Sequence, residues 1–227
     1  MANGEAGTLT NTKAVIFDYG EVLCHAPSAD EIETIAKMFD LSREQFRVLW
    51  TRNRDQFDRG DISSEVYWRK FAEDAGRPVD DELLRDLAER DVAMWSTVNP
   101  EMIAWLEELS KAGIKTAVLS NMHADMADYA RRNFRWLVGL NCVTLSAEVR
   151  SIKPQPEIYE HCLRGLKTSP GETLFIDDRE VNVKAAEAMG IHGIQFKSLP
   201  LLRRELEAAG FPVLPSATKM PPASGTN

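Results

Sequence analysis

The sequence predicts an α/β fold in which a doubly wound, Rossmann-like parallel sheet carries an inserted, all-helical cap domain. Two observations predict it. Over residues 96–210, short apolar runs alternate with helical segments, and right-handed crossovers then place helices on both faces of a parallel sheet. Residues 24–95, the expected cap, show helical patterns without a strand. Such an insertion lies over the carboxyl ends of the strands, where open α/β sheets bind ligands.

The first core strand is expected at Lys13–Asp18, where the run KAVIFD is apolar until its final acidic residue and Gly20 then breaks it. The core is therefore expected to comprise residues 1–23 and 96–210, around the cap. Residues 211–227 contain four prolines among serine, threonine and glycine residues, a composition that does not hold regular structure. We expect them to form a flexible tail.

The cap is expected to contain four helices. Their N-caps are predicted at Ser28, Ser42, Ser63 and Asp80, with glycine stops at Gly60 and Gly76. The loop at Gly60–Ser63 is expected to reach toward the substrate. Three tryptophans, Trp50, Trp68 and Trp95, fall among apolar helical positions, which favours core packing over ligand contact.

The rest of the core is expected to alternate helix and strand. After a helix capped by Asn99 and ended by Gly113, the strands are expected at Ile114–Ser120, Leu140–Leu145, Thr173–Asp177 and Ile191–Phe196. The helices between them are expected at Met122–Phe134, Pro156–Leu166 and Val181–Met189.

The composition excludes several classes of function. With 227 residues, of which 44% are hydrophobic and 27% charged, the chain can bury a core without disulfides. A net charge of −8 without basic blocks argues against nucleic acid as a partner. No apolar run approaches membrane-spanning length, and residues 1–11 lack a signal core. Three cysteines without metal-type spacing indicate reduced thiols, which are typical of cytoplasmic proteins. Together, these observations predict a cytoplasmic protein that does not bind membranes.

Polar residues stand at or just beyond the predicted strand ends. They are Asp18, Ser120, Lys153 and the adjacent pair Asp177 and Asp178. Parallel strands would bring all of them to one edge of the sheet. A carboxylate, a hydroxyl, an ammonium and an acidic pair suit phosphoryl transfer, which depends mainly on positioning and charge neutralisation.

Four motifs occur in order along the chain: FDYGEVL, VLSN, IKPQPEIY and FIDDREVN. They resemble the four motifs of the haloacid dehalogenase superfamily of hydrolases, and the resemblance spans essentially residues 13–196. The KPxxxIY run, the paired aspartates and the position of the helical cap are most similar to the subgroup that holds α-glucose-1-phosphatase and the phosphatase domain of soluble epoxide hydrolase. The resemblance implies a Mg²⁺-dependent phosphatase that acts on a small phosphorylated metabolite.

The resemblance also implies roles for individual residues. Asp18 would attack phosphorus and form an aspartyl-phosphate that water later hydrolyses. Mg²⁺ would be held by Asp18, by the backbone carbonyl of Gly20 and by Asp178, with Asp177 acting directly or through water, helped by Asn182. The charges agree with this assignment, because three converging carboxylates repel one another unless a cation lies between them, and Mg²⁺ prefers oxygen ligands.

The phosphate would be held by Ser120, by the Asn121 backbone and by Lys153. Ser120 and Lys153 each have a purely structural alternative. Ser120 stands just before a predicted helix and could simply cap it. Lys153 would ordinarily be a surface residue, although the prolines that follow stiffen a segment able to point its ammonium inward. His25 and His123 lie near the expected mouth of the site and are predicted to be packed or solvated.

One position departs from the family pattern. Most phosphatases of this superfamily carry an acidic residue two positions after the nucleophile, to protonate the leaving group, whereas this chain has Gly20. The glucose-1-phosphatase-like subgroup also has glycine there. Two interpretations of Glu21 are open: it takes the place of the missing acid, or it is simply a polar residue of the turn. Without that acid, substrates with good leaving groups, such as sugar 1-phosphates, are expected to be preferred.

Three functions remain open at this point. The first is a phosphatase. The second is a 2-haloacid dehalogenase, which would share Asp18 and Lys153 but would not need the acidic pair. The third is a catalytically silent phosphate-binding relative, suggested by Gly20. The residue pattern makes no prediction of the oligomeric state.

Overall fold

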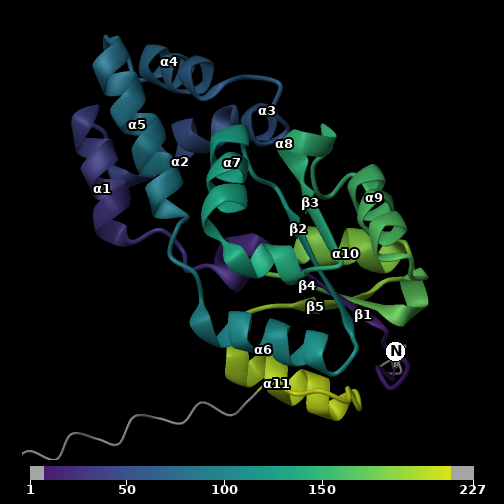
Figure 1. The fold of residues 1–227 in the computed structure, drawn as a ribbon. Coiled ribbons are helices and arrows are strands. Elements are labelled where there is room, and N and C mark those ends of the chain that lie inside the picture. Colours follow the sequence, from purple (N-terminus) through teal and green to yellow (C-terminus); the bar gives the residue numbers. More distant parts are fainter. Residues whose placement is uncertain (1–7, 216–227) are drawn as a thin grey trace, which may run out of the picture.

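A computed structural model describes residues 8–215 of the chain. Its centre is a sheet of five parallel strands in the order β3-β2-β1-β4-β5 (Figure 1). The strands are β1 (Ala14–Phe17), β2 (Lys115–Ser120), β3 (Cys142–Leu145), β4 (Thr173–Asp177) and β5 (His192–Gln195). The predicted doubly wound fold and its strand positions are therefore confirmed; β4 has the expected bounds, and each of the other four strands is one or two residues shorter than expected.

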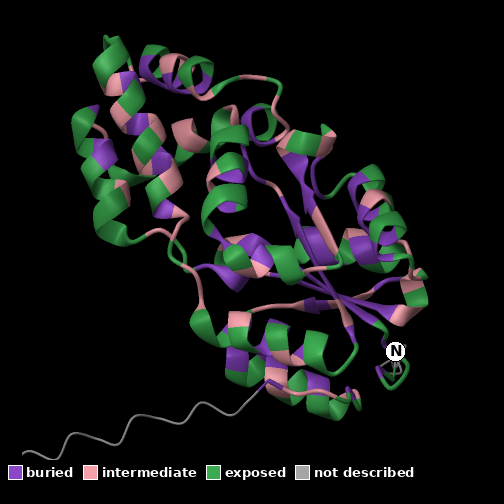
Figure 2. Ribbon diagram, viewed as in Figure 1, coloured by how far each residue is buried: buried purple, intermediate pink, exposed green. Residues whose placement is uncertain are grey.

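Helices cover both faces of the sheet, as the alternating pattern predicted. They are α6 (Pro100–Lys111), α7 (Ala124–Asn133), α8 (Ser146–Val149), α9 (Pro156–Leu166), α10 (Glu180–Ala188) and α11 (Leu199–Ala208). In β1, Val15 and Phe17 face a cluster built with α6, α7 and α11, whereas Ala14 and Ile16 face a cluster built with α9 and α10. Every residue of β1 is buried (Figure 2). Such a strand is apolar throughout because both of its faces are covered.

The cap contains five helices within the described residues, one more than predicted: α1 (Ala29–Met38), α2 (Arg43–Arg52), α3 (Arg54–Asp58), α4 (Ser64–Asp74) and α5 (Asp81–Met94). The expected second helix breaks at Asn53. The predicted N-caps at Ser28, Ser42, Ser63 and Asp80 each accept a hydrogen bond from the first helical turn.

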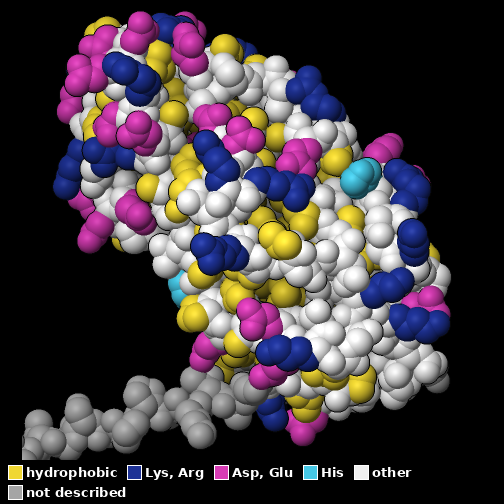
Figure 3. Space-filling model, in the orientation of Figure 1, with side chains coloured by type: hydrophobic (Ala, Val, Ile, Leu, Met, Phe, Trp, Pro, Cys, Tyr) yellow, Lys and Arg dark blue, Asp and Glu magenta, His cyan; other side chains and the backbone are white. Residues whose placement is uncertain are grey.

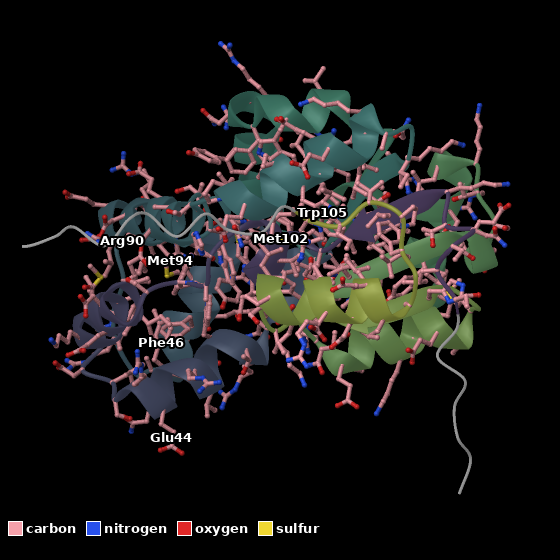
Figure 4. The ribbon with its side chains drawn as sticks, turned by 90° about the horizontal axis from the view of Figure 1, so that it is seen from below. Glu44, Phe46, Arg90, Met94, Met102 and Trp105 are labelled. Atoms are coloured by element: carbon pink, nitrogen blue, oxygen red, sulfur yellow. The ribbon has the colours of Figure 1, made fainter. Side chains whose placement is uncertain are left out.

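The cap has a hydrophobic cluster of its own. Its buried members run from Ile35 to Met94 and are separate from the clusters that cover the sheet. Figure 4 places Phe46 and Met94 inside the cap and Met102 and Trp105 inside the core. This separation agrees with the predicted division of the chain into core and cap, whose boundaries remain a prediction.

Two antiparallel linkers join the cap to the core. Cys24 pairs with Val98, and on either side the His25 amide donates to Thr97 and the Asn99 amide donates to Leu23. A second contact lies between α3 and α8, where the Ser146 hydroxyl donates to the Asp58 carbonyl at 2.5 Å. The cap is therefore held over the carboxyl ends of the strands (Figure 1).

The carboxyl-terminal region differs from expectation in two respects. Helix α11 was not among the expected elements, although its Leu199, Leu202 and Leu206 are buried at helical spacing. The predicted tail also begins too early, because Phe211 is buried and Trp105 Nε1 donates to the Val213 carbonyl at 3.0 Å. Residues 216–227, the remainder of that predicted tail, lie outside the described residues.

The surface carries charges of both signs. On the face drawn in Figure 3, basic and acidic side chains are interspersed, over the cap in particular. Such mixing gives no positive stripe for the phosphates of a nucleic acid on this face. No helix within residues 8–215 has both the length and the apolar character needed to cross a membrane.

Candidate active site

The predicted polar residues converge at one edge of the sheet. Asp18 directly follows β1, Ser120 ends β2, and Asp177 ends β4 with Asp178 next to it. All four line one cavity of about 490 Å³ or support its floor, and Lys153 joins them from the loop after α8. The convergence follows from the parallel register, which ends these strands side by side.

Lys153 lies inward, between two carboxylates. Its Nζ is 2.7 Å from Asp18 Oδ1 and 2.6 Å from Asp177 Oδ2, and its side chain is 1% exposed. Asn121 holds the loop in place, because its side chain accepts from the Lys153 amide at 2.7 Å and donates to the Lys153 carbonyl at 3.0 Å. A buried ammonium held in this way can neutralise charge on Asp18 and on a group bound beside it.

The two adjacent aspartates differ in their surroundings. Asp177 is fully buried, and the Arg179 amide and the Asn182 amide group donate to its Oδ1 while Lys153 donates to its Oδ2. Asp178 is partly exposed and its side chain lines the cavity. Asp177 is thus occupied by donors of the chain itself, whereas the Asp178 carboxylate faces the space where a ligand would bind.

Burial and the neighbouring carboxylates disfavour ionisation of Asp18 and Asp178. Burial raises the pKa of Asp18 above its usual range, partly opposed by Lys153. Burial, then the neighbouring Asp177, raises the pKa of Asp178 to about 6. Burial alone would lower the pKa of Lys153, but Asp177 and Asp18 raise it, so Lys153 stays protonated. With all three carboxylates ionised, the site would carry more negative charge than its one buried ammonium balances.

This arrangement fits a divalent cation. Carboxylate oxygens of Asp18, Asp177 and Asp178 lie within 4.8 Å of one another. A hard, oxygen-preferring ion such as Mg²⁺ would offset the excess negative charge and favour the ionised forms of Asp18 and Asp178. The Gly20 carbonyl, predicted as a further ligand, belongs to the π-type turn Tyr19–Leu23 directly after Asp18.

Ser120 and Asn121 line the cavity, but not at the start of a helix. Helix α7 begins at Ala124 with His123 as its N-cap, two residues later than expected. Ser120 is therefore not the helix cap that its place before the predicted helix suggested. Its hydroxyl instead contacts the Asn121 carbonyl at 3.4 Å. The two residues remain candidates for phosphate binding through their side chain and backbone.

Gly20 is not required by the backbone or by packing. Its φ is −61°, which any residue can adopt, and a Cβ there would meet only Trp95 Cζ3, at 3.7 Å. A side chain at this position would point toward the cap side of the cavity and would fit. Glu21, the possible substitute acid, is exposed and lines the cavity with a φ of 56°.

The cap wall of the cavity was not predicted correctly. The loop Gly60–Ser63 does not line it; Gly60 instead packs against Ala147 of α8. Residues of α2 and α3 form the wall, including Trp50 and Arg54, and Trp95 joins them. Helix packing within the cap decides which loop faces the core, and this was not evident from local sequence.

Two further cavity or support residues, Asp58 and Asp91, were missed, and His123 was expected near the mouth but given no site role. Asp58 and His123 line the cavity, and Asp91 is fully buried behind them. Asp91 carried a usable signal, since it follows Leu87 by four residues and precedes Met94 by three, on the buried side of α5. His123 is buried, whereas His25 is exposed and lies outside the cavity lining.

Replacing Lys153 by methionine is expected to destabilise the fold by roughly 3–5 kcal/mol, because Asp18 and Asp177 would be left buried without their shared cation. Mg²⁺ should recover part of that loss by supplying positive charge. Thermal unfolding with and without Mg²⁺ measures both effects. Lys184→Met, which removes an exposed ion pair with Glu180, is the matched control and should leave stability nearly unchanged. Equal effects of the two substitutions would contradict the assignment.

Known proteins are similar to this chain in sequence and in fold. The sequence model of the haloacid dehalogenase-like hydrolases matches residues 12–190. The chain is 28% identical to sesquiterpene phosphatase astK of Aspergillus oryzae over 82% of this chain and 90% of that protein. It is 29% identical to acyl-CoA dehydrogenase family member 10 of Mus musculus over 88% of this chain, but it spans only 19% of that protein.

Solved structures agree. The HAD family enzyme bt-2542 of Bacteroides thetaiotaomicron, 24% identical, superposes with a TM-score of 0.69 over 82% of this chain and 94% of its own. A structure of the same enzyme contains magnesium and inorganic phosphate. L-2-haloacid dehalogenase of Xanthobacter autotrophicus, 23% identical, superposes with a TM-score of 0.63 over 90% and 85% of the two chains. With the family model matching most of its length, this chain is a hydrolase that belongs to the haloacid dehalogenase-like family.

Proposed function

We propose that this protein is a Mg²⁺-dependent phosphatase that releases phosphate from a small phosphorylated metabolite through an aspartyl-phosphate at Asp18. The observation that carries the proposal is the Asp18 carboxylate beside the buried Lys153 ammonium, with the acidic Asp177 and Asp178 within 4.8 Å. A carboxylate nucleophile that attacks a substrate without a phosphate group would not need that acidic pair. A phosphate-binding nucleophile does, because the dianionic substrate must be neutralised by a cation that the pair helps to hold.

The proposed reaction has two displacements at phosphorus. An Asp18 carboxylate oxygen bonds to phosphorus while the bond from phosphorus to the leaving oxygen breaks; the leaving oxygen keeps the electron pair and takes a proton from solvent water. Water then attacks the phosphorus of the aspartyl-phosphate, which releases phosphate and restores Asp18. Lys153 stabilises the negative charge of the transferring group in both steps. Mg²⁺, held by Asp18, Asp178 and the Gly20 carbonyl with Asp177 in support, would supply further charge neutralisation when bound.

Similar proteins support the proposed phosphatase activity. One relative of nearly equal length is named a phosphatase, and a structure of similar fold holds magnesium and inorganic phosphate. A haloacid dehalogenase has a similar fold too, so the fold alone does not select the reaction. The acidic pair favours phosphate, because a dehalogenase would need only the nucleophile and the lysine.

A screen of phosphorylated metabolites tests the proposal, with Mg²⁺ or with excess chelator, and with Asp18→Asn as the inactive control. Phosphate release that needs both Mg²⁺ and Asp18 is the expected result. A parallel assay for halide release from 2-haloacids tests the alternative. Halide release in chelator, without phosphate release from any ester, would overturn the proposal in favour of a dehalogenase. Phosphate binding without any turnover would favour a silent relative.

The glycine at position 20 predicts a steep dependence on the leaving group. General acid catalysis is typically worth about 10²–10⁴ in rate, so without an acid at that position substrates with acidic leaving groups should dominate. We propose sugar 1-phosphates as the natural class, with acyl and aryl phosphates also favoured. The measurement is kcat/KM, with single-turnover rates, across esters of graded leaving-group acidity at saturating Mg²⁺.

Gly20→Asp provides the complementary test, since a side chain fits there. It should accelerate hydrolysis of poor leaving groups and flatten the gradient. A gradient that is already flat in the parent protein, with chemistry rate-limiting, would mean that an acid is present. Glu21→Gln would then be expected to steepen it.

A further inference from the structure

Two of the three cysteines of the chain lie together in the core. Cys142 begins β3, the strand at one edge of the sheet, and Cys162 lies on α9, which packs against that strand (Figure 1). Cys24, in contrast, belongs to the linkers between core and cap. All three are free thiols, and neither Cys142 nor Cys162 lines the active-site cavity. The two therefore lie outside the groups to which the proposed phosphatase reaction assigns a role.

The surface of α9 is shaped to receive the Cys142 sulfur. Gly165 follows Cys162 by three residues, so both lie on the same face of the helix. A Cβ atom on Gly165 would overlap Cys142 Sγ. Glycine weakens a helix, but its missing side chain here leaves room for the sulfur next to Cys162.

Polar contacts hold β3 against α9 at the same place. Thr144 follows Cys142 by two residues and so lies on the same face of the strand. Its hydroxyl oxygen is 3.6 Å from Cys142 Sγ and 3.2 Å from Nδ1 of His161, the residue before Cys162. The Cys162 thiol also hydrogen-bonds to the Cys142 sulfur. The two thiols are thus held side by side in the folded chain.

The two thiols differ in accessibility and in charge. Cys142 is partly exposed, whereas Cys162 is fully buried. Hydrogen bonding from Cys162, and more weakly from Thr144, lowers the pKa of Cys142 to about 6 against the effect of burial, and the Arg131 charge acts in the same direction. Burial raises the pKa of Cys24 to about 12. At neutral pH, Cys142 is therefore mostly the thiolate, the reactive form of a cysteine, and solvent reaches it.

We propose that Cys142 and Cys162 form a redox pair, in which a peroxide oxidises Cys142 and Cys162 then closes a disulfide between β3 and α9. The Cys142 thiolate attacks one oxygen of hydrogen peroxide, the O–O bond breaks, and the departing hydroxide takes a proton from solvent to become water. The Cys162 sulfur then attacks Sγ of the Cys142 sulfenic acid, the S–O bond breaks, and the leaving hydroxide takes the Cys162 proton. In total the two thiols lose two electrons and one peroxide is reduced to two waters.

The disulfide would close the chain segment 142–162. This segment contains Ser146, which contacts the cap, and Lys153 of the active site. A cross-link restricts the unfolded chain more than the folded one, in which β3 and α9 already pack together. The oxidised protein is therefore expected to have a Tm several degrees above that of the reduced protein. Peroxide should not raise the Tm of Cys142→Ser.

Peroxide treatment of the reduced parent protein tests the proposal without any substrate. A small excess of hydrogen peroxide is added, the protein is denatured, and the remaining thiols are alkylated and counted by mass spectrometry. Free thiols should fall from three to one, and dithiothreitol should restore all three. Digestion without reductant should yield a peptide pair that joins Cys142 to Cys162. Because no phosphate ester is involved, failure of this test leaves the proposed phosphatase function in place.

Substitutions separate the roles of the two thiols. Cys162→Ser should leave a sulfenic acid on Cys142, which dimedone traps. Cys142→Ser should slow oxidation of the remaining thiols at least about tenfold, because an ordinary thiol is only a few per cent thiolate at pH 7. Cys24→Ser is the matched control and should form the same disulfide at the rate of the parent protein. Thermal unfolding in reductant checks that each variant folds, and the peptide pair of the parent protein decides the proposal if one does not.

Three free thiols after peroxide treatment, a disulfide that includes Cys24, or a disulfide between two copies of the chain would overturn the inference. A sulfenic acid on Cys162 instead of Cys142 would overturn it as well, and so would oxidation of Cys142 beyond the sulfenic acid without a disulfide to Cys162.

Discussion

Asp18→Asn is expected to lower kcat by at least about 10⁴-fold, because removal of a covalent nucleophile typically costs that much or more. The fold should survive the change. The Tyr19 amide, at 2.6 Å, and Lys153 Nζ, at 2.7 Å, both contact Asp18 Oδ1, and an asparagine can place its carbonyl oxygen there. The substitution also removes one charge from a site with excess negative charge, so stability in chelator should be equal or higher.

Steady-state kinetics and thermal unfolding, each compared with the parent protein, measure these effects. Asp30→Asn, on the exposed face of α1, is the matched control and should change neither. Fluoroberyllate, a mimic of the aspartyl-phosphate, should inhibit the parent protein only with Mg²⁺ and should not bind Asp18→Asn. Undiminished turnover by Asp18→Asn would refute the nucleophile assignment.

Removal of Mg²⁺ is expected to lower turnover by at least about 10³-fold, because metal-assisted charge stabilisation is worth several kcal/mol. Without the cation, burial raises the pKa of Asp18 and so disfavours its ionised, nucleophilic form. Activity measured in excess chelator and after restoring Mg²⁺ tests this. Full activity in chelator would contradict it, and Ca²⁺ in place of Mg²⁺ provides a control for charge alone.

The two aspartates of the pair should respond differently. Asp178→Ala is expected to weaken Mg²⁺ binding, measured by calorimetry, about tenfold more than Asp177→Ala. The reason is that donors of the chain already occupy the Asp177 oxygens, whereas Asp178 faces the cavity. Asp177→Ala should instead cost stability, because Lys153 loses one of its two partners. Equal or reversed metal affinities would overturn the ligand assignment.

The core and the floor of the site could be predicted from the sequence because both depend on local signals. A buried strand such as Ala14–Phe17 is an apolar run, and the polar residue that ends it marks the sheet edge. Once the strands are parallel, the topology alone brings Asp18 and Asp177 together. Lys153 was identified through its motif, and its inward position depends on the hydrogen bonds of Asn121.

The cap wall could not be predicted in the same way, because it depends on how helices pack. Nothing local to Asn53 shows that the chain turns there and brings Arg54 toward Asp91. The start of α7 at Ala124 likewise follows from the loop that Ser146 holds through the Met122 amide, at 2.8 Å. Helix α11, in contrast, could have been predicted, because its buried leucines recur at helical spacing in the sequence.

The central claim is that Asp18 carries the phosphoryl group during turnover. Its most direct test is a rapid acid quench of the protein during hydrolysis of a sugar 1-phosphate with Mg²⁺, followed by digestion and mass spectrometry of the peptide that contains Asp18. We expect a phosphoryl group on Asp18 that disappears as substrate is consumed and is absent in chelator. A phosphoryl group on any other residue, or none at any time while phosphate is released and Asp18→Asn remains active, would contradict it.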